Sequence, residues 1–137
     1  MLNFIGEINI IGIISAILIL FILGGMWFTL IFGKQYRLAL GKENIPQEKL
    51  KPIFLIGPLL CSSINVFTSH LLMHALKVAT LQEAITFGVV VGFGYLAATS
   101  VNTGINPNIP RPLLYGLISG SYFFLAGIIT SLILFLI

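Results

Sequence analysis

Two histidines are the side chains in this sequence best suited to acid–base or metal chemistry. His70 and His74 are four residues apart, so on an α-helix both imidazoles project from one face. A proton relay or a metal-binding pair needs that arrangement. The same spacing also suits two neutral histidines that form hydrogen bonds with neighbouring helices, and we expect this structural role.

The sequence offers few side chains that could bind a metal ion. Zinc takes three or four protein ligands, whereas the chain has two histidines, no aspartate and one cysteine, Cys61, which lies nine residues before His70. Glu7 and Glu83 would complete a site only if folding brought them beside the histidines. We therefore expect no metal and no cofactor.

Other kinds of chemistry have no recognisable motif in this sequence. It contains no nucleophile–base–acid set, no phosphate-binding loop and no nucleotide-binding fingerprint. We therefore expect no catalytic residues, no enzymatic activity and no nucleic-acid partner.

A second group of polar side chains falls on one face of a predicted helix. Tyr95, Thr99 and Asn102 are separated by steps of four and three residues, the spacing of neighbours along a helix. Together with Asn65 and the two histidines of the preceding apolar stretch, this face would line a polar cavity. The alternative is a set of hydrogen bonds between helices that encloses no space, and the sequence leaves both interpretations open.

The elements that hold these side chains are predicted to be membrane-spanning helices. Hydrophobic residues make up 58% of the 137 residues and charged residues only 8%, against about 25% charged residues in soluble domains. A helix needs about 20 apolar residues to cross a bilayer core of about 30 Å. Four uncharged stretches reach this length, at residues 8–32, 53–76, 84–103 and 113–137. We predict an all-α integral membrane protein, with residues 1–137 forming a single bundle of four transmembrane helices.

Positive charge predicts how this bundle is oriented. Six of the seven Lys and Arg residues lie in two connections, five in residues 34–51 and one at Arg111, whereas Lys77 lies on the opposite side. Basic loops stay in the cytoplasm, so we expect both connections there and both termini on the other side. The 34–51 connection is also expected to attract the anionic headgroups of membrane lipids.

Glycine and proline mark the local structure of the 34–51 connection. The first helix is expected to continue beyond the membrane as far as Gly41, which suits a helix C-terminus. Residues 45–51 are predicted to form a short interfacial helix with Pro46 in its first turn. Pro52 and Pro58 leave two starting points for the second span, one near Pro52 with a kink and the other at Pro58.

Small residues predict how the spans associate. Lipid tails are as apolar as leucine, so close packing through small side chains holds membrane helices together. Gly88 and Gly92 form one G-x-x-x-G pair, and Gly116 and Gly120 form another. We expect the last two spans to pack closely through these pairs, with a homodimer contact as the rival use. Trp27 is expected to anchor the first span at the membrane interface.

Short motifs in three of the spans resemble one family. Residues 23–28, Leu-Gly-Gly-Met-Trp-Phe, followed by Phe-Gly-Lys at 32–34, resemble the first-helix signature of the family known as domain of unknown function 1761. The glycine-rich third span that reaches Asn102, the Arg111-Pro112 pair and the Ser-Gly-Ser-Tyr cluster at 119–122 are also similar, although family members have Asn-Ala-Gly-Tyr in the last position. Residues 103–107, Thr-Gly-Ile-Asn-Pro, depart from the family pattern. The resemblance implies a four-helix protein of the bacterial inner membrane and supplies no catalytic residues.

Two functions are compatible with these observations, while a third, a membrane enzyme, would have only the histidine pair behind it. One is a small channel or permease, oligomeric because four short helices rarely enclose a solute path, with the polar face and the histidines along that path. The other is a non-transporting accessory protein that binds lipid or another membrane protein, which the lack of an intramembrane carboxylate favours. We expect the channel or permease.

Overall fold

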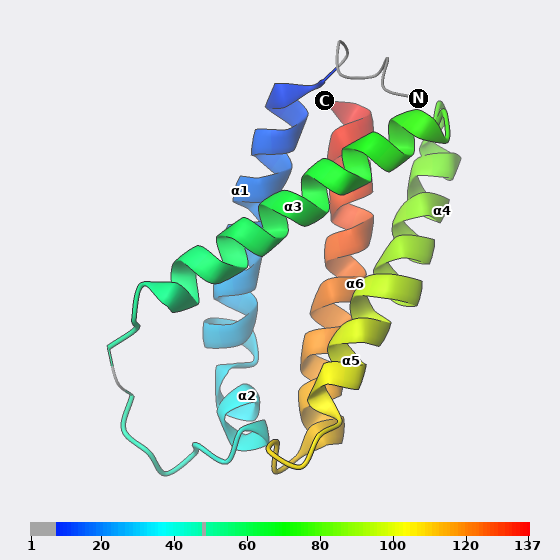
Figure 1. The fold of residues 1–137 in the computed structure, drawn as a ribbon. Coiled ribbons are helices and arrows are strands. Elements are labelled where there is room, and N and C mark those ends of the chain that lie inside the picture. Colours follow the sequence, from blue (N-terminus) through cyan, green and yellow to red (C-terminus); the bar gives the residue numbers. More distant parts are fainter. Residues whose placement is uncertain (1–7, 48) are drawn as a thin grey trace.

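The structure, a computed structural model, describes residues 8–47 and 49–137, and all of its regular elements there are helical (Figure 1). They are, in chain order, α1 (Ile10–Met26), the π-helix η2 (Trp27–Ile31), α2 (Gly33–Ala39), α3 (Ile53–Ala75), α4 (Leu81–Val91), the π-helix η3 (Gly92–Ala97), α5 (Ala98–Gly104) and α6 (Pro112–Leu136). Four helical stretches are long and apolar enough to cross a membrane: Ile10–Ile31, Ile53–Ala75, Leu81–Gly104 and Pro112–Leu136. The predicted all-α membrane bundle with four spans is confirmed.

Apolar side chains cover the outside of these spans. Between 11% and 44% of each span is buried within the protein, although the mean hydropathy of the spans runs from 1.4 to 2.6. Large side chains such as Leu30 and Leu113 are 75% and 80% exposed. Such a surface is stable only where hydrocarbon replaces water around it.

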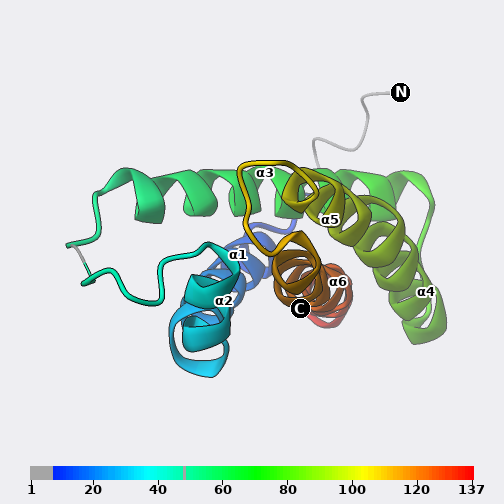
Figure 2. The ribbon, with the colours of Figure 1, turned by 90° about the horizontal axis from the view of Figure 1, so that it is seen from below.

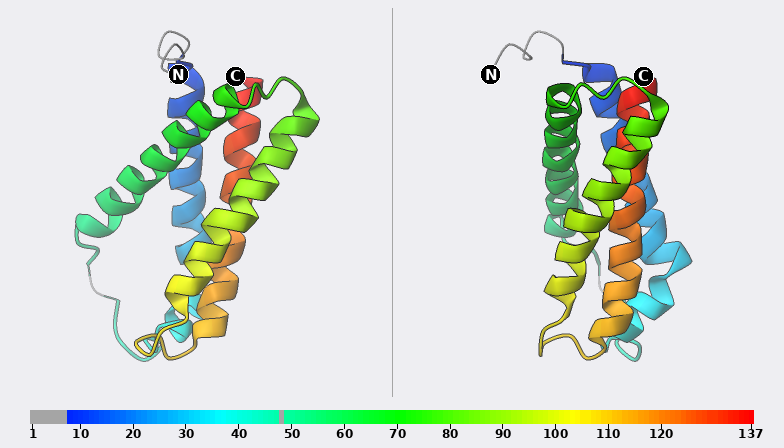
Figure 3. Two further views of the ribbon diagram at one scale, coloured as in Figure 1. Left: turned by 45° about the vertical axis from the view of Figure 1, so that its right-hand side comes forward. Right: turned by 90° about the vertical axis from the view of Figure 1, so that its right-hand side faces the viewer.

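The four spans do not pack as four equal neighbours. α6 lies between α1 on one side and α4–η3–α5 on the other, and it contacts all of them (Figure 2). α3 crosses obliquely over α1 and α6 and meets α4 only near the turn that joins them (Figures 1 and 3). The buried core lies where these helices cross, and it includes Leu20, Val66, Met73, Phe87 and Tyr122.

Glycines set the separation between α4–η3 and α6. A β-carbon at Gly88 would collide with the Ser131 hydroxyl, and one at Gly92 would lie 2.7 Å from the carbonyl oxygen of Phe124. Both contacts are closer than real β-carbons come, so only glycine lets the two backbones approach this far. The facing helix contributes Gly127, whose own β-carbon would collide with Gly92.

The second glycine pair lies between the same two spans, nearer the other end. β-Carbons at Gly116 and Gly120 would lie 3.3 and 2.8 Å from the methyl groups of Val101 in α5. All four glycines of the two G-x-x-x-G pairs therefore face the contact between the third and fourth spans. Dispersion contacts across such a close approach hold membrane helices together.

A capping box fixes the start of the third span. The Thr80 hydroxyl accepts a hydrogen bond from the Glu83 backbone N–H at 3.2 Å, and the Glu83 carboxylate accepts from the N–H groups of Thr80 and Ala79 at 3.0 and 2.8 Å. This reciprocal bonding satisfies the free N–H groups of the first turn. α4 thus begins at Leu81, three residues before the uncharged stretch does, because Glu83 belongs to the cap.

The connection between the first two spans differs from its prediction. α2 ends at Ala39, followed by Gly41 with φ of +66°, but the described residues of 45–51 form no helix. That short helix was a wrong prediction, and Glu48 within it lies outside the described residues. The large apolar side chains of this stretch, Ile45 and Leu50, are exposed, so their packing does not offset the cost of helix nucleation. The Arg37 guanidinium donates to the carbonyl oxygens of Lys42 and Ile45, in the turns just after α2.

The start of the second span, left open by the sequence, lies next to Pro52. α3 begins at Ile53, and Pro58 lies inside it as its sixth residue. A proline there removes one backbone hydrogen bond and crowds the preceding turn. This part of α3 projects away from the bundle, with Phe54 and Leu60 well exposed.

Arg111 ties the two basic connections together. Its guanidinium donates to the Leu38 carbonyl oxygen at 3.0 Å, and its backbone N–H donates to the Ala39 carbonyl oxygen at 3.2 Å. Both are carbonyls of the last turn of α2, where intrahelical donors run out, and the Leu38 carbonyl oxygen also accepts from the Gly41 N–H at 3.1 Å. Glu43 lies 3.7 Å from the same guanidinium, an exposed ion pair that adds little stability.

We predict that Gly92→Leu destabilises the protein by about 1–3 kcal/mol, the usual cost of overpacking, because the added side chain must separate α4 from α6. Thermal unfolding in detergent, followed by circular dichroism, would measure the decrease in Tm. Gly57→Leu is the control, because a β-carbon at Gly57 has nothing within 4 Å. An unchanged Tm for Gly92→Leu would contradict this role of the glycine.

Candidate functional site

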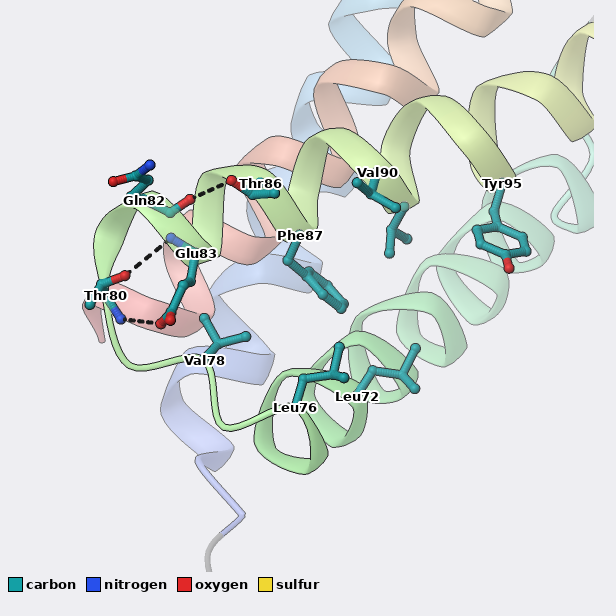
Figure 4. A pocket seen from close by; sticks show the side chains of 11 residues that line it. Leu72, Leu76, Val78, Thr80, Gln82, Glu83, Thr86, Phe87, Val90 and Tyr95 are labelled. Atoms are coloured by element: carbon teal, nitrogen blue, oxygen red, sulfur yellow. Dashed lines mark hydrogen bonds between the residues drawn. The ribbon is translucent and has the colours of Figure 1, made fainter.

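A hollow lies between α3 and α4, which share a short turn and then diverge (Figure 4). Its volume is about 730 Å³. Leu72 and Leu76 of α3 form one wall, and Phe87 and Val90 of α4 form the other. We call this hollow the α3–α4 cleft. Since it is open at the side, it faces the hydrocarbon of the membrane.

Polar groups near the turn end of the cleft bond to one another. The Thr86 hydroxyl donates to the Gln82 carbonyl oxygen at 2.8 Å, and the Thr80 and Glu83 side chains are engaged in the capping box. Their hydrogen bonds serve the first turns of α4. This end of the cleft therefore offers few polar groups for a ligand.

Tyr95 lies at the far end of the cleft. Its ring projects from the helix toward the side where α3 runs (Figure 4), and it is 71% exposed. It belongs to η3, the π-helix Gly92–Ala97. Single π-turns within α-helices often occur at functional sites, because they change which side chains face a given direction.

Further polar side chains follow Tyr95 along the third span and precede Leu72 on α3. Thr99 and Asn102 follow it at four and seven residues, and both are exposed. On α3, Thr68 and Asn65 precede the wall residue Leu72 by four and seven residues, which places them on the same side of that helix. Thr68 is exposed and Asn65 is half-buried. The lining of the cleft itself is polar at the turn end and at Tyr95 and apolar between them, and it does not include Asn65, Thr68, Thr99 or Asn102.

The two histidines lie elsewhere. His70 and His74 line a separate depression of about 580 Å³ together with Lys77 and with Leu134 and Phe135 of α6. Both are half-buried. The six residues expected to form one cavity therefore do not line one hollow. His70 and His74 line the depression beside α6, Tyr95 lines the cleft, and Asn65, Thr99 and Asn102 are among the lining residues of neither.

Metal ligands do not gather in the part of the chain that the structure describes. No three His, Cys, Asp or Glu side chains converge among residues 8–47 and 49–137. Cys61 is exposed on α3, away from the histidine depression. Glu7, one of the two carboxylates considered as a further ligand, lies outside the described residues.

Two hydrogen bonds that the sequence did not predict join the first and last spans. Trp27 Nε1 donates to the Ile118 carbonyl oxygen at 3.0 Å, and the Tyr122 hydroxyl donates to the Leu20 carbonyl oxygen at 3.0 Å. Gly24 makes room for the second bond, since a β-carbon there would lie 2.9 Å from the Tyr122 hydroxyl. Trp27, expected to anchor the helix at the interface, thus bonds to a carbonyl of the protein itself.

A series of aromatic rings runs from Tyr122 toward the end of the bundle that carries the basic connections. The ring of Phe28 lies 5.2 Å from that of Tyr122 and 4.8 Å from that of Tyr36, which in turn lies 5.7 Å from Tyr115. Burial and the neighbouring Tyr115 raise the pKa of Tyr36 to about 12. Tyr36 therefore stays neutral at physiological pH, and the cluster adds no charge to the interior.

We predict that Gly24→Leu lowers the stability of the bundle by about 1–3 kcal/mol, because the new side chain displaces Tyr122 and overpacks the contact. The adjacent Gly25→Leu is the matched control, since a β-carbon at Gly25 has nothing within 4 Å. Thermal unfolding of both variants in the same detergent gives the comparison. Equal Tm values would mean that the close contact between Gly24 and Tyr122 does not hold the two spans together.

The motifs that carry the family resemblance meet in this structure, since Gly24 and Trp27 of the first span contact residues 118–122 of the last. A family model described as "Protein of unknown function (DUF1761)" matches residues 11–135. No curated protein and no solved structure matches the chain. Because the match runs through all four spans, the chain belongs to the DUF1761 family.

Proposed function

We propose that this membrane protein is an oligomeric channel or permease for a small solute, with the exposed polar side chains of the third span along the solute path. The observation that carries the proposal is the exposure of Tyr95, Thr99 and Asn102 on the outside of a membrane-spanning helix. Their polar groups would otherwise face hydrocarbon, where an unmet hydrogen bond is costly.

The chemistry of the two walls supports an uncharged, hydrogen-bonding solute. Beyond Glu83 at the turn, the described residues of α3 and of Leu81–Gly104 carry no Asp, Glu, Lys or Arg. Hydroxyl and amide groups along a path replace part of the hydration shell that a solute loses. An ion would find no compensating charge there, and a proton-coupled mechanism would find no carboxylate.

An oligomer follows from the shape of the cleft. Within one chain the cleft is open at the side, so a polar solute in it would contact lipid tails. Another protein surface must close that side before a path separated from the bilayer exists. The proposed permease is therefore built from more than one copy.

We expect purified protein in liposomes to speed the entry of small neutral solutes such as glycerol or urea, measured by stopped-flow light scattering after an osmotic step. Asn102→Leu and Tyr95→Phe should each slow entry about fivefold, the effect of losing about 1 kcal/mol of hydrogen bonding. Phe93→Leu, at an exposed apolar position of η3, should behave as wild type. Entry no faster than in empty liposomes, across neutral solutes and ions, would refute transport.

A second candidate function rests on the apolar part of the cleft. Leu72, Leu76, Phe87 and Val90 line a hollow that a lipid acyl chain would fill, as in a lipid-binding accessory protein without transport. Native mass spectrometry from mild detergent distinguishes the two. A stoichiometric lipid that Val90→Trp displaces, together with absent solute flux, would favour this second function.

We further propose that the protein lies in the bacterial inner membrane with its basic end in the cytoplasm. The support is the location of five basic residues in the 34–51 connection and of Arg111 at the same end, bonded to the α2 C-terminus. Loops with excess Lys and Arg are retained on the cytoplasmic side. Both termini and the α3–α4 turn would then face outward.

Cysteine labelling tests this orientation, because Cys61 is the single cysteine of the chain. In a Cys61→Ser background, an impermeant maleimide added to intact cells should label Ala79→Cys in the α3–α4 turn. It should label Asn44→Cys in the basic connection only after the cells are opened. The reverse pattern would invert the proposed orientation.

A further inference from the structure

Lys77 has an unusual backbone conformation for a residue with a side chain. Its φ is +54°, and among the described residues it is the one position other than glycine with a positive φ. Its backbone N–H donates to the His74 carbonyl oxygen, and the Val78 N–H donates to the Met73 carbonyl oxygen, both at 3.0 Å. These two bonds form the Schellman motif that ends many helices, in which this position is usually glycine.

The end of α2 has the same motif in its usual form. The Gly41 N–H donates to the Leu38 carbonyl oxygen at 3.1 Å. The Lys42 N–H donates to the Arg37 carbonyl oxygen at 2.9 Å. Glycine adopts the positive φ of this motif readily, whereas a β-carbon makes it unfavourable. The end of α3 is therefore strained where the end of α2 is not, and residues held in such conformations cluster at functional sites.

The Lys77 side chain lines the histidine depression, the hollow of about 580 Å³ that also includes His70 and His74. No Asp or Glu is among its lining residues. The Glu83 carboxylate accepts hydrogen bonds from backbone N–H groups of the α3–α4 turn. Within residues 8–47 and 49–137, no carboxylate forms an ion pair with Lys77. The lining of the depression thus brings a positive charge and no negative one.

Lys77 also lies at the depth of lipid headgroups. It follows Ala75, the last residue of the second span, by two positions, and the α3–α4 turn lies at the end of the bundle where α6 ends (Figure 1). Lysines near the ends of membrane helices extend their ammonium groups to the interface, where lipid phosphates lie. Leu134 and Phe135 of α6 give the same depression an apolar side.

We propose that the histidine depression binds the phosphate group of an anionic membrane lipid, with the Lys77 ammonium as its charged donor. The ammonium has three donors and the phosphate has strong acceptor oxygens, so the two form charge-assisted hydrogen bonds. Free inorganic phosphate has the same oxygens, but it has no acyl chain to pack against Leu134 and Phe135. The site shares no residue with the proposed solute path, so lipid binding and transport are tested separately.

Nuclear magnetic resonance of labelled histidines reads this site alone, because His70 and His74 are the only histidines of the chain and both line it. Protein with isotope-labelled histidine, purified without a histidine tag, would be placed in phosphatidylcholine nanodiscs at constant pH. Replacing part of that lipid with phosphatidylglycerol should shift the imidazole resonances until the site is saturated. Inorganic phosphate added to phosphatidylcholine nanodiscs should leave them unshifted.

Lys77→Gly removes the ammonium without disturbing the fold, because glycine suits the positive φ, so its Tm should be at least that of wild type. The variant should raise the phosphatidylglycerol fraction that gives half of the shift about tenfold, the effect of losing a hydrogen bond to a charged group. Lys77→Arg keeps the charge and should retain the shift. Lys49→Gly removes an exposed lysine of the basic connection and is the matched control, which should respond as wild type does.

Four outcomes would overturn the inference. The first is no response of the imidazole resonances to phosphatidylglycerol. The second is an equal response of Lys77→Gly, which would report only the surface potential of the anionic bilayer. The third is an equal loss in the Lys49→Gly control, and the fourth is an equal response to inorganic phosphate, which would indicate a site for a free anion. A Tm of Lys77→Gly below that of wild type would contradict the backbone strain at this position.

Discussion

The structure depends on one constraint, which is that hydrocarbon offers no hydrogen bonds. Every backbone N–H and C=O within the membrane must find its partner in the protein, and helices meet that demand within a single segment. The same constraint acts on side chains, and several hydroxyl groups within the spans bond to a nearby carbonyl. Thr29, Thr86 and Ser121 all donate to the carbonyl of the preceding turn.

Because lipid surrounds all four helices, apolar surface alone cannot decide which of them touch. Shape and a few long-range hydrogen bonds decide it instead. Gly88, Gly92 and Gly127 bring α4 and α6 to backbone contact, and the Trp27–Ile118 and Tyr122–Leu20 bonds hold α1 to α6. α3 has no comparable glycine contact, since a β-carbon at its Gly57 has nothing within 4 Å, and it follows an oblique path across α1 and α6.

The sequence was sufficient to predict the fold class, because uncharged stretches of this length have no stable alternative to the membrane. Spacing also grouped Tyr95, Thr99 and Asn102 on one face. What spacing cannot give is the direction in which a face points, since that depends on how neighbouring helices cross. This is why the sequence joined His70 and His74 to the polar face, whereas the structure turns them toward α6.

The central position of α6 affects the order in which the bundle assembles during synthesis. Three other spans contact α6, yet it follows all of them in the chain and therefore leaves the ribosome after them. During that interval α1 and α3 can already meet each other, while the glycine surface of α4 faces lipid or the insertion machinery. The bundle therefore reaches its compact form in a late step, when α6 enters between neighbours that are already in the membrane.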